Sequence, residues 1–478
     1  MKFTRKAGLL GLVVALAAAG ASAQVDFSKY VALGDSLTAG YASGALTKFY
    51  QDHSYPSILA KQFGINSFQQ PTISDPGIGS YGTVLQLTRL VVGPGGISPV
   101  IGPTPGASGQ PTNATLQGPY GNLGIPGAAA GDLLTKTGDI TKLLTGHIDP
   151  KTLMYDIILR DGQHTALEQA IGAGPTFVTV WIGNNDVLGA VLSGVAMEGV
   201  TLTPKATFQQ QYTQILGAIR QNRPNASIVV ANIPDVAGIP FATTIKPYIV
   251  NPANGSHIPL LGADGPLSES DFVTLGASAL LAQGIGIPAA AGGTGLPLPE
   301  GSIDQTGLHA GVILRAAEMT AIRARTADLN QVIAAVAGGV NAKLFDVNAL
   351  FARIATQGYT LGGIRLTKSF LTGGLFSYDG VHPQRLGYAV VANEMIKAIN
   401  AAYGTTVPEV DLRPYLGGET VMTASAAGLT VFSSAAAVSL LGNFVPGAEA
   451  SALVPHVGTV RRHVTHRGSE RGSIPPNE

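Results

Sequence analysis

The chain contains no cysteine. This absence excludes a disulfide framework, a thiolate zinc site, a cysteine nucleophile and a lipid-modified N-terminal cysteine. Charge is also scarce, because Asp, Glu, Lys and Arg make up only 12% of the 478 residues, about half the usual share of roughly 25%. The 29 basic and 29 acidic residues balance, so the composition indicates neither a nucleic acid nor an anionic membrane as a partner.

Aromatic residues are few, at 6%, whereas hydrophobic residues make up 45% and the mean hydropathy is +0.26. A large core is therefore expected, and disorder over most of the length is excluded. The length suits one enlarged domain or two ordinary ones. The 62 glycines and 30 prolines follow no collagen-like repeat and indicate long irregular loops instead.

The first residues have the features of a signal peptide. Three basic residues precede an apolar run at 7–19, and Ala21-Ser22-Ala23 supplies a small-x-small cleavage pattern. The run is too short to span a bilayer, which needs about 20 residues. We predict cleavage after residue 23 and export to the periplasm or the extracellular space.

Apolar strand-like runs then alternate with amphipathic helical stretches. Strands are predicted at residues 30–33, 177–182, 227–231 and 344–347. Helices are predicted at residues 54–63, 205–222, 314–337 and 384–402. This alternation predicts an α/β domain over residues 24–403, with a parallel sheet covered on both faces and Trp181 in its core.

Two Gly/Pro-rich insertions, at about 73–122 and 237–306, interrupt this domain. The second is rich in apolar residues, includes a predicted short helix near 268–283, and is expected to pack as a cap. Residues 404–478 form a C-terminal appendage and tail, predicted to be disordered from about 457. The uncharged stretch 421–445 would also suit a surface or membrane anchor, but its many small polar residues favour packing on the domain.

Gly34-Asp35-Ser36-Leu37 directly follows the first predicted strand. Open α/β sheets bind their ligands at the carboxyl ends of strands, so the Ser36 hydroxyl is well placed for chemistry. Gly34 would permit a tight turn that lifts the hydroxyl out of the sheet. The alternative is that Ser36 is the N-cap of the next helix.

Asp379-Gly380-Val381-His382-Pro383 precedes the last predicted helix. A histidine acts best as a general base when an acceptor holds its other ring nitrogen. Asp379 lies three residues upstream of His382, and the intervening glycine can bend the chain so that the carboxylate reaches the ring. The alternative is that Asp379 or His382 caps the helix, with Pro383 at its first position.

Gly183-Asn184-Asn185-Asp186 follows another predicted strand, so an asparagine amide there could donate to the oxyanion of ester hydrolysis. An ordinary Asn/Asp turn is the alternative. The segment 123–128 offers a further donor in the Gly127 amide, with Gly124 as a nearby alternative.

Together these four segments resemble the SGNH superfamily of GDSL-type esterases and lipases over roughly residues 27–402, outside the two insertions. The resemblance implies a flavodoxin-like three-layer α/β/α sandwich. It makes Ser36 the nucleophile, with Asp379 and His382 completing the triad. It also implies an oxyanion hole built from the Ser36 amide, Gly127 and Asn185, and no metal or organic cofactor.

The sequence therefore predicts an exported serine ester hydrolase acting on an acyl or lipid ester. The nearly uncharged insertions and the few aromatic residues favour an acyl chain over a polysaccharide. Deacetylation of a carbohydrate is the second hypothesis, and an inactive cell-surface binding module is the third. The chain has neither a G-x-S-x-G nor an H-E-x-x-H motif, which would indicate other hydrolase classes.

Overall fold

The computed structural model describes residues 25–79, 82–93, 96–416, 431–445 and 447–454. The predicted signal peptide lies outside these residues, as do positions 417–430 and 446 of the predicted appendage and its tail beyond 454.

Five parallel strands form the central sheet. They are β1 (Tyr30–Gly34), β4 (Asn122–Gly124), β5 (Phe177–Trp181), β6 (Ser227–Ala231) and β15 (Lys343–Phe345). Their order across the sheet is β15-β6-β5-β1-β4. Numbered along the chain, this is the flavodoxin-like order 2-1-3-4-5, so the predicted fold class is confirmed.

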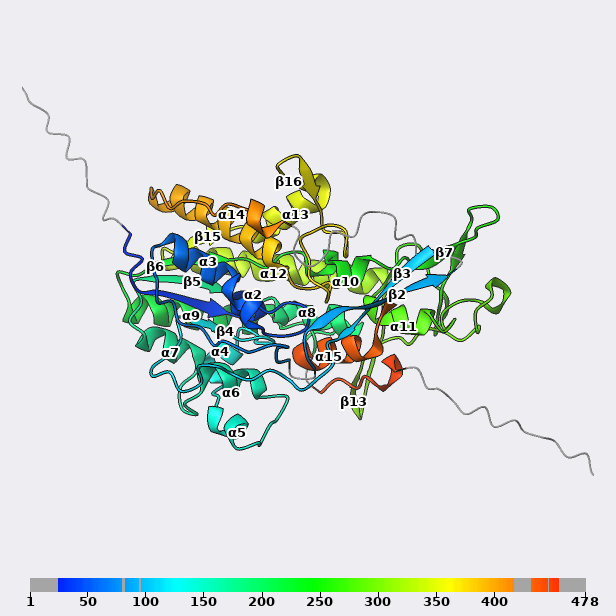
Figure 1. Ribbon diagram of the computed structural model, residues 1–478, viewed down its shortest axis with the longest axis horizontal. Coiled ribbons are helices and arrows are strands. Elements are labelled where there is room, and N and C mark those ends of the chain that lie inside the picture. Colours follow the sequence, from blue (N-terminus) through cyan, green and yellow to red (C-terminus); the bar gives the residue numbers. More distant parts are fainter. Residues whose placement is uncertain (1–24, 80–81, 94–95, 417–430, 446, 455–478) are drawn as a thin grey trace, which may run out of the picture.

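Alternate side chains of each strand enter separate cores on the two faces of the sheet. Val31 and Leu33 belong to one core, and Tyr30 and Ala32 belong to the other. The first core is covered by α7 (Ala166–Gly172), α9 (Lys205–Asn222) and α12 (Ala316–Gly339). The second is covered by α3 (Tyr55–Gln62), α13 (Val347–Gln357) and α14 (Arg385–Tyr403). The three layers can be followed in Figure 1.

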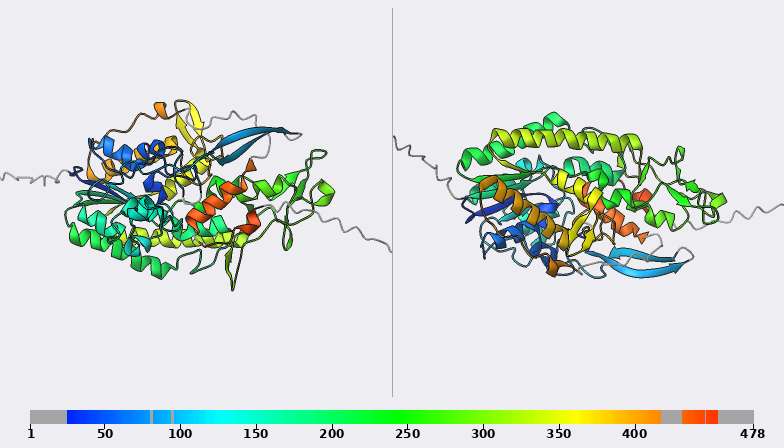
Figure 2. Two further views of the ribbon diagram at one scale, coloured as in Figure 1. Left: turned by 60° about the horizontal axis from the view of Figure 1, so that its bottom comes forward. Right: turned by 90° about the horizontal axis from the view of Figure 1, so that it is seen from above.

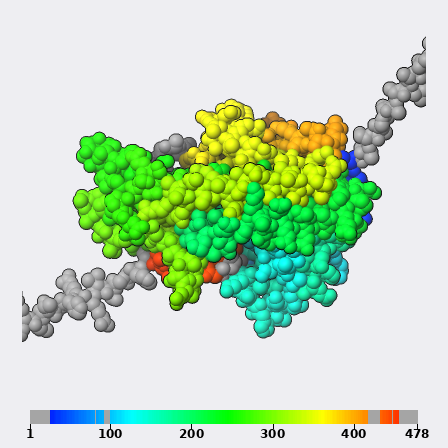
Figure 3. All heavy atoms as spheres, turned by 180° about the vertical axis from the view of Figure 1, so that it is seen from behind, coloured from blue at the N-terminus to red at the C-terminus, as the bar shows by residue number. Residues whose placement is uncertain are grey.

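The first insertion contains a long antiparallel hairpin of β2 (Leu85–Gly93) and β3 (Gly96–Pro103). The second is built from short elements, including α10 (Pro240–Thr243), η2 (Leu275–Ala277) and α11 (Ser278–Leu281). The helix expected near 268–283 is thus confined to α11 and the turn of 3-10 helix before it. Figure 3 shows the face opposite to that of Figure 1, across which the yellow-green segment that includes α12 runs.

The described C-terminal residues pack against the rest of the molecule. The strand β18 (Val431–Phe432) pairs in parallel with β3, and α15 (Ser434–Phe444) follows it. Leu440 and Phe444 of α15 belong to the same core as Leu33 of the central sheet. Figure 2 shows α15 in the middle of the molecule, between the β2–β3 hairpin and the second insertion. Within the described residues, no helix combines the length and apolar character needed to cross a membrane.

Candidate active site

The predicted site residues gather at the carboxyl edge of the sheet. Ser36 lies two residues beyond the end of β1, and Asn184 and Asn185 lie three and four residues beyond the end of β5. The chain runs outward in opposite directions from β1 and β5, so these neighbouring strands form the topological switch point. Open α/β sheets bind their ligands in the crevice at this point.

Close backbone contacts set the position of Ser36. It is the first residue of α1 (Ser36–Ala39), and the Asp35 carboxylate caps this helix by accepting from the Leu37 amide at 3.0 Å. The alternative that Ser36 is the N-cap is therefore wrong. Gly34 does not make a left-handed turn; instead, a Cβ at this position would collide with the Trp181 carbonyl oxygen on β5.

Ser36, His382 and Asp379 form one hydrogen-bonded chain. The His382 Nε2 lies 2.9 Å from the Ser36 Oγ, and the His382 Nδ1 lies 2.9 Å from the Asp379 Oδ2. Asp379 and His382 come from the loop before α14, whose N-cap is Gln384, so neither of them caps that helix. Pro383 precedes the cap and is not the first helical residue. Residues 346 positions apart in the sequence thus meet in the order needed for proton transfer.

Several donors fix the Asp379 carboxylate. It accepts hydrogen bonds from the backbone amides of Gly44, Val381 and His382 at 3.1, 2.9 and 2.8 Å, and from the Ser377 hydroxyl at 3.0 Å. Gly380 has a φ of +69°, which lets the loop turn back on Asp379. Burial alone would raise the pKa of Asp379, but the nearby His382 and these hydrogen bonds outweigh it and lower the pKa.

The three polar residues after β5 point to different partners. The Asn185 Nδ2 donates to the Ala128 carbonyl at 2.9 Å, next to Gly127. Since an amide nitrogen carries two hydrogens, Asn185 retains one for a further acceptor. The Asn184 Nδ2 donates to the Asp35 Oδ2 at 2.8 Å, and the Asp186 Oδ2 accepts from the Ala130 amide at 3.0 Å. These bonds tie the segments after β1, β4 and β5 together.

Two fully buried carboxyl groups of this layer have raised pKa values. Burial raises the pKa of Asp35 to about 6, against the hydrogen bond from Asn184, and that of Asp186 to about 7. The sequence motifs contain both residues but gave no role for either. Gly44 and Ser377 were not predicted as partners of Asp379, because nothing in the local pattern marks them.

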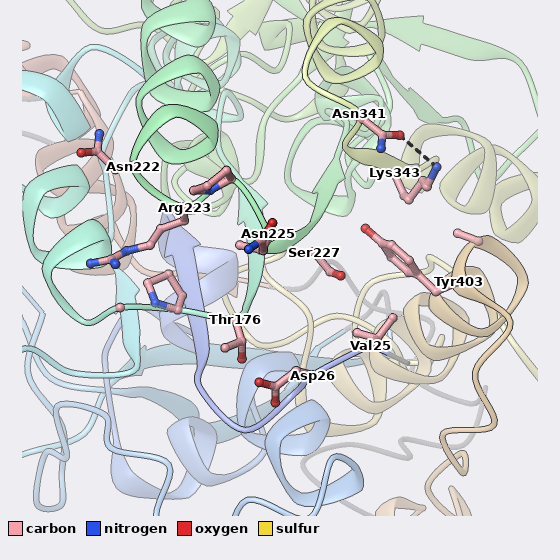
Figure 4. A pocket seen from close by; sticks show the side chains of 15 residues that line it. Val25, Asp26, Thr176, Asn222, Arg223, Asn225, Ser227, Asn341, Lys343 and Tyr403 are labelled. Carbon is pink, nitrogen blue, oxygen red and sulfur yellow. Dashed lines mark hydrogen bonds between the residues drawn. The ribbon is translucent and has the colours of Figure 1, made fainter. Parts of the chain in front are cut away.

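Cavities of different character lie at the two ends of the sheet. A cavity of about 730 Å³ with a mixed polar and apolar lining lies at the amino ends of the strands, where Thr176, Ser227, Arg223 and Lys343 contribute polar groups (Figure 4). It is at the wrong edge for a ligand site of this fold. A smaller, almost wholly apolar cavity of about 90 Å³ reaches Leu37, Val381 and Pro383, the chain neighbours of Ser36 and His382.

Within the described residues, no cluster of three or more His, Asp and Glu side chains could hold a metal ion. The serine, histidine and aspartate lie at the carboxyl edge of a parallel sheet, in the hydrogen-bonded order that is typical of triad hydrolases.

The profile of the GDSL-like lipase/acylhydrolase family matches residues 30–395, more than half of the chain. The chain therefore belongs to this family of ester-hydrolysing enzymes, as the sequence motifs indicated.

Comparison with known proteins adds three distant structural similarities. An extracellular lipase from Streptomyces rimosus is 16% identical, with 78% of this chain and 99% of that one covered and a TM-score of 0.32. A phospholipase A1 from Streptomyces albidoflavus is 13% identical, with coverages of 79% and 100% and a TM-score of 0.29. An alpha/beta hydrolase from the metagenome of Lake Arreo, Spain, is 15% identical, with coverages of 79% and 95% and a TM-score of 0.31. A search of curated proteins finds no match.

Proposed function

We propose that this protein is an exported serine ester hydrolase that works through an acyl-enzyme. The observation that carries the proposal is the chain of two 2.9 Å contacts from the Ser36 hydroxyl through His382 to Asp379. A serine hydroxyl is a weak nucleophile unless a positioned base removes its proton, and a carboxylate on the other ring nitrogen orients that base.

In the first half of the reaction, the Ser36 Oγ attacks the ester carbonyl carbon as its proton passes to the His382 Nε2. The carbonyl electrons move onto oxygen, where the Ser36 amide, the Gly127 amide and the Asn185 side chain are the proposed donors. Amides in the first turn of a helix lack partners within that helix, which suits Ser36 at the start of α1. Collapse of this intermediate breaks the ester C–O bond, and the leaving alcohol takes the proton from His382.

In the second half, water attacks the acyl-enzyme while His382 accepts its proton. The bond to the Ser36 Oγ breaks, the acid leaves, and the proton returns to the serine. Asp379 remains ionised throughout, which agrees with its lowered pKa, and it holds the histidine in the required tautomer.

An acyl or lipid ester is the proposed substrate. The apolar cavity is lined almost only by carbon, and its lining includes Leu37, Val381 and Pro383, the chain neighbours of Ser36 and His382. Such a lining binds an acyl chain through the hydrophobic effect but offers no hydrogen bonds to a sugar. Export is proposed from the basic, apolar and small-residue pattern of residues 1–23.

The test is hydrolysis of p-nitrophenyl esters from acetyl to palmitoyl by the mature protein and by Ser36→Ala. We expect Ser36→Ala to lower kcat by at least about 10⁴-fold, with an unchanged melting temperature, because the nucleophile is lost without a loss of packing. A fluorophosphonate probe should label the parent protein at Ser36 and leave the variant unlabelled.

Equal activity in the two proteins would contradict Ser36 as the nucleophile. Hydrolysis of the acetyl ester alone would favour carbohydrate deacetylation. A folded protein that neither hydrolyses any ester nor takes up the probe would favour the binding module.

A further inference from the structure

The catalytic side chains are shut off from solvent. Ser36 is 3% exposed, His382 is 1% exposed and Asp379 is fully buried. The Tyr41 ring lies 5.0 Å from the His382 ring between centroids, and the Phe444 ring lies 5.2 Å from it. An ester carbonyl must come within about 3–3.5 Å of the nucleophile to react, so a substrate cannot reach Ser36 in this arrangement.

The C-terminal helix α15 provides much of this cover. Phe444 is its last residue, and the neighbouring Asn443 donates from its side chain to the Tyr41 hydroxyl at 2.6 Å. The Asn443 carbonyl oxygen faces Gly127 so closely that a Cβ there would lie 2.5 Å from it. The helix thus reaches both the proposed base and the proposed oxyanion donor. A carbonyl oxygen carries partial negative charge, so its position beside Gly127 is unfavourable for an oxyanion.

The composition of this cover indicates what could displace it. Residues 431–448 include no charged side chain, and α15 buries Leu440 and Leu441 as well as Phe444. Backbone hydrogen bonds hold both ends, from the Ser433 amide to the Ile101 carbonyl at 3.0 Å and from the Glu449 amide to the Leu308 carbonyl at 2.7 Å. These bonds anchor the chain on either side of α15, so a displacement of the helix would be confined to the residues between them.

We propose that α15 is a cap that closes the active site in water and is displaced at the surface of a neutral lipid phase. This inference rests on the proposed function and narrows its substrate to aggregated, uncharged lipid esters. Lifting α15 in water exposes its apolar side chains and those beneath it, which is unfavourable in proportion to the apolar area exposed. At a lipid surface the same side chains enter an apolar phase, so the open state gains population there.

The absence of native cysteine allows a reversible test. A Cβ at Gly82 would lie 3.9 Å from the Ser439 Cβ in the middle of α15, close to the roughly 3.8 Å usual in disulfides. The double variant Gly82→Cys/Ser439→Cys can therefore lock the cap when oxidised and release it when reduced. Tributyrin, assayed below and above its solubility limit, and dissolved p-nitrophenyl butyrate are the substrates.

For the parent protein and the reduced variant, we expect the rate of tributyrin hydrolysis to rise about tenfold or more when droplets appear, compared with the rate extrapolated from dissolved tributyrin. The reason is that only a minor population of the protein is open in water. The oxidised variant should lose hydrolysis of both substrates and regain it with dithiothreitol. The single variants, treated identically, control for the oxidant.

A second disulfide near α15 tests whether any crosslink in this region abolishes hydrolysis. A Cβ at Gly102 of β3 would lie 3.9 Å from the Ser433 Cβ, at the foot of α15. The oxidised Gly102→Cys/Ser433→Cys protein should keep its activation by droplets, because the backbone is already anchored there.

The proposal that α15 is a cap would be overturned if the oxidised Gly82→Cys/Ser439→Cys protein hydrolysed both substrates as fast as the same protein does after reduction with dithiothreitol. If the rate of the parent protein follows the tributyrin concentration smoothly through the solubility limit, the proposal that a lipid surface opens the cap is wrong. If the reduced protein hydrolyses no ester at all, the proposed function itself fails, and the cap with it.

Discussion

At the scale of single residues, neighbouring side chains of one type have different tasks. Asn184 and Asn185 are adjacent and both donate hydrogen bonds, but Asn184 donates to the carboxylate of Asp35 and Asn185 to a backbone carbonyl beside Gly127. Sequence spacing alone cannot separate them, because both are asparagines after a buried strand, and only the family resemblance assigned the oxyanion role to Asn185. The partners come from distant segments that no local pattern identifies.

This difference leads to a prediction for Asn185→Ala. We expect kcat to fall by about 10²–10³-fold with little change in KM, because a donor to the oxyanion is felt mainly in the transition state. The measurement is steady-state hydrolysis of a p-nitrophenyl ester.

Asn184→Ala is the control for this substitution. It removes the donor to the buried Asp35 carboxyl, so its main effect should be a lower melting temperature. If Asn185→Ala instead raises KM with kcat unchanged, its amide binds the ground state and is not an oxyanion donor.

At the scale of secondary-structure elements, the position of the nucleophile depends on how closely the strands approach each other. A side chain at Gly34 would collide with the Trp181 carbonyl of β5 and the Thr38 side chain of α1. We predict that Gly34→Ala destabilises the fold by about 1–3 kcal/mol and lowers kcat through displacement of Ser36. Urea unfolding and ester hydrolysis measure the two effects.

Gly217→Ala is a suitable control, because it lies in α9 and a Cβ there has no neighbour within 4 Å. This variant should be as stable as the parent protein or slightly more so. If Gly34→Ala behaves in the same way, close packing at the end of β1 does not position the serine.

The elements that sequence reasoning predicted well carry a strong local signal. α9 and β6 have the predicted bounds, because an amphipathic period and a β-branched run mark them. β4 has only three residues, and the β2–β3 hairpin lies in a Gly/Pro-rich stretch, so neither has such a signal. The composition of residues 421–445 favoured packing on the domain over an anchor, but the position of α15 beside His382 depends on tertiary contacts that no local pattern identifies.

At the scale of the whole molecule, charged residues are few, and some carboxyl groups are fully buried. Burial raises the pKa of Asp35 to about 6 and that of Asp186 to about 7, whereas the unfolded chain has the ordinary value of 3.8. Between these values the unfolded state binds fewer protons than the folded state. Stability therefore decreases as the pH rises through this window.

Asp186→Asn should remove the part of this dependence that comes from Asp186. The variant keeps an oxygen to accept from the Ala130 amide, which now bonds the Asp186 Oδ2 at 3.0 Å, but it has no proton to lose. We expect its free energy of unfolding, relative to the parent protein, to increase between pH 5 and pH 8 by a few kcal/mol, since one pKa unit corresponds to about 1.4 kcal/mol. Urea unfolding at several pH values measures this difference.

Asp35→Asn provides the internal comparison for this prediction. The pKa of Asp35 is about 6, roughly one unit below that of Asp186. The stability of Asp35→Asn relative to the parent protein should therefore stop changing at a lower pH. Asp379 acts in the opposite direction, because its lowered pKa makes it stabilising above the unfolded value and less so as the pH falls. The measurements therefore stay above pH 5, where Asp379 is ionised in both states. If the free energies of unfolding of Asp186→Asn and the parent protein differ by the same amount from pH 5 to pH 8, Asp186 is already ionised in the folded core.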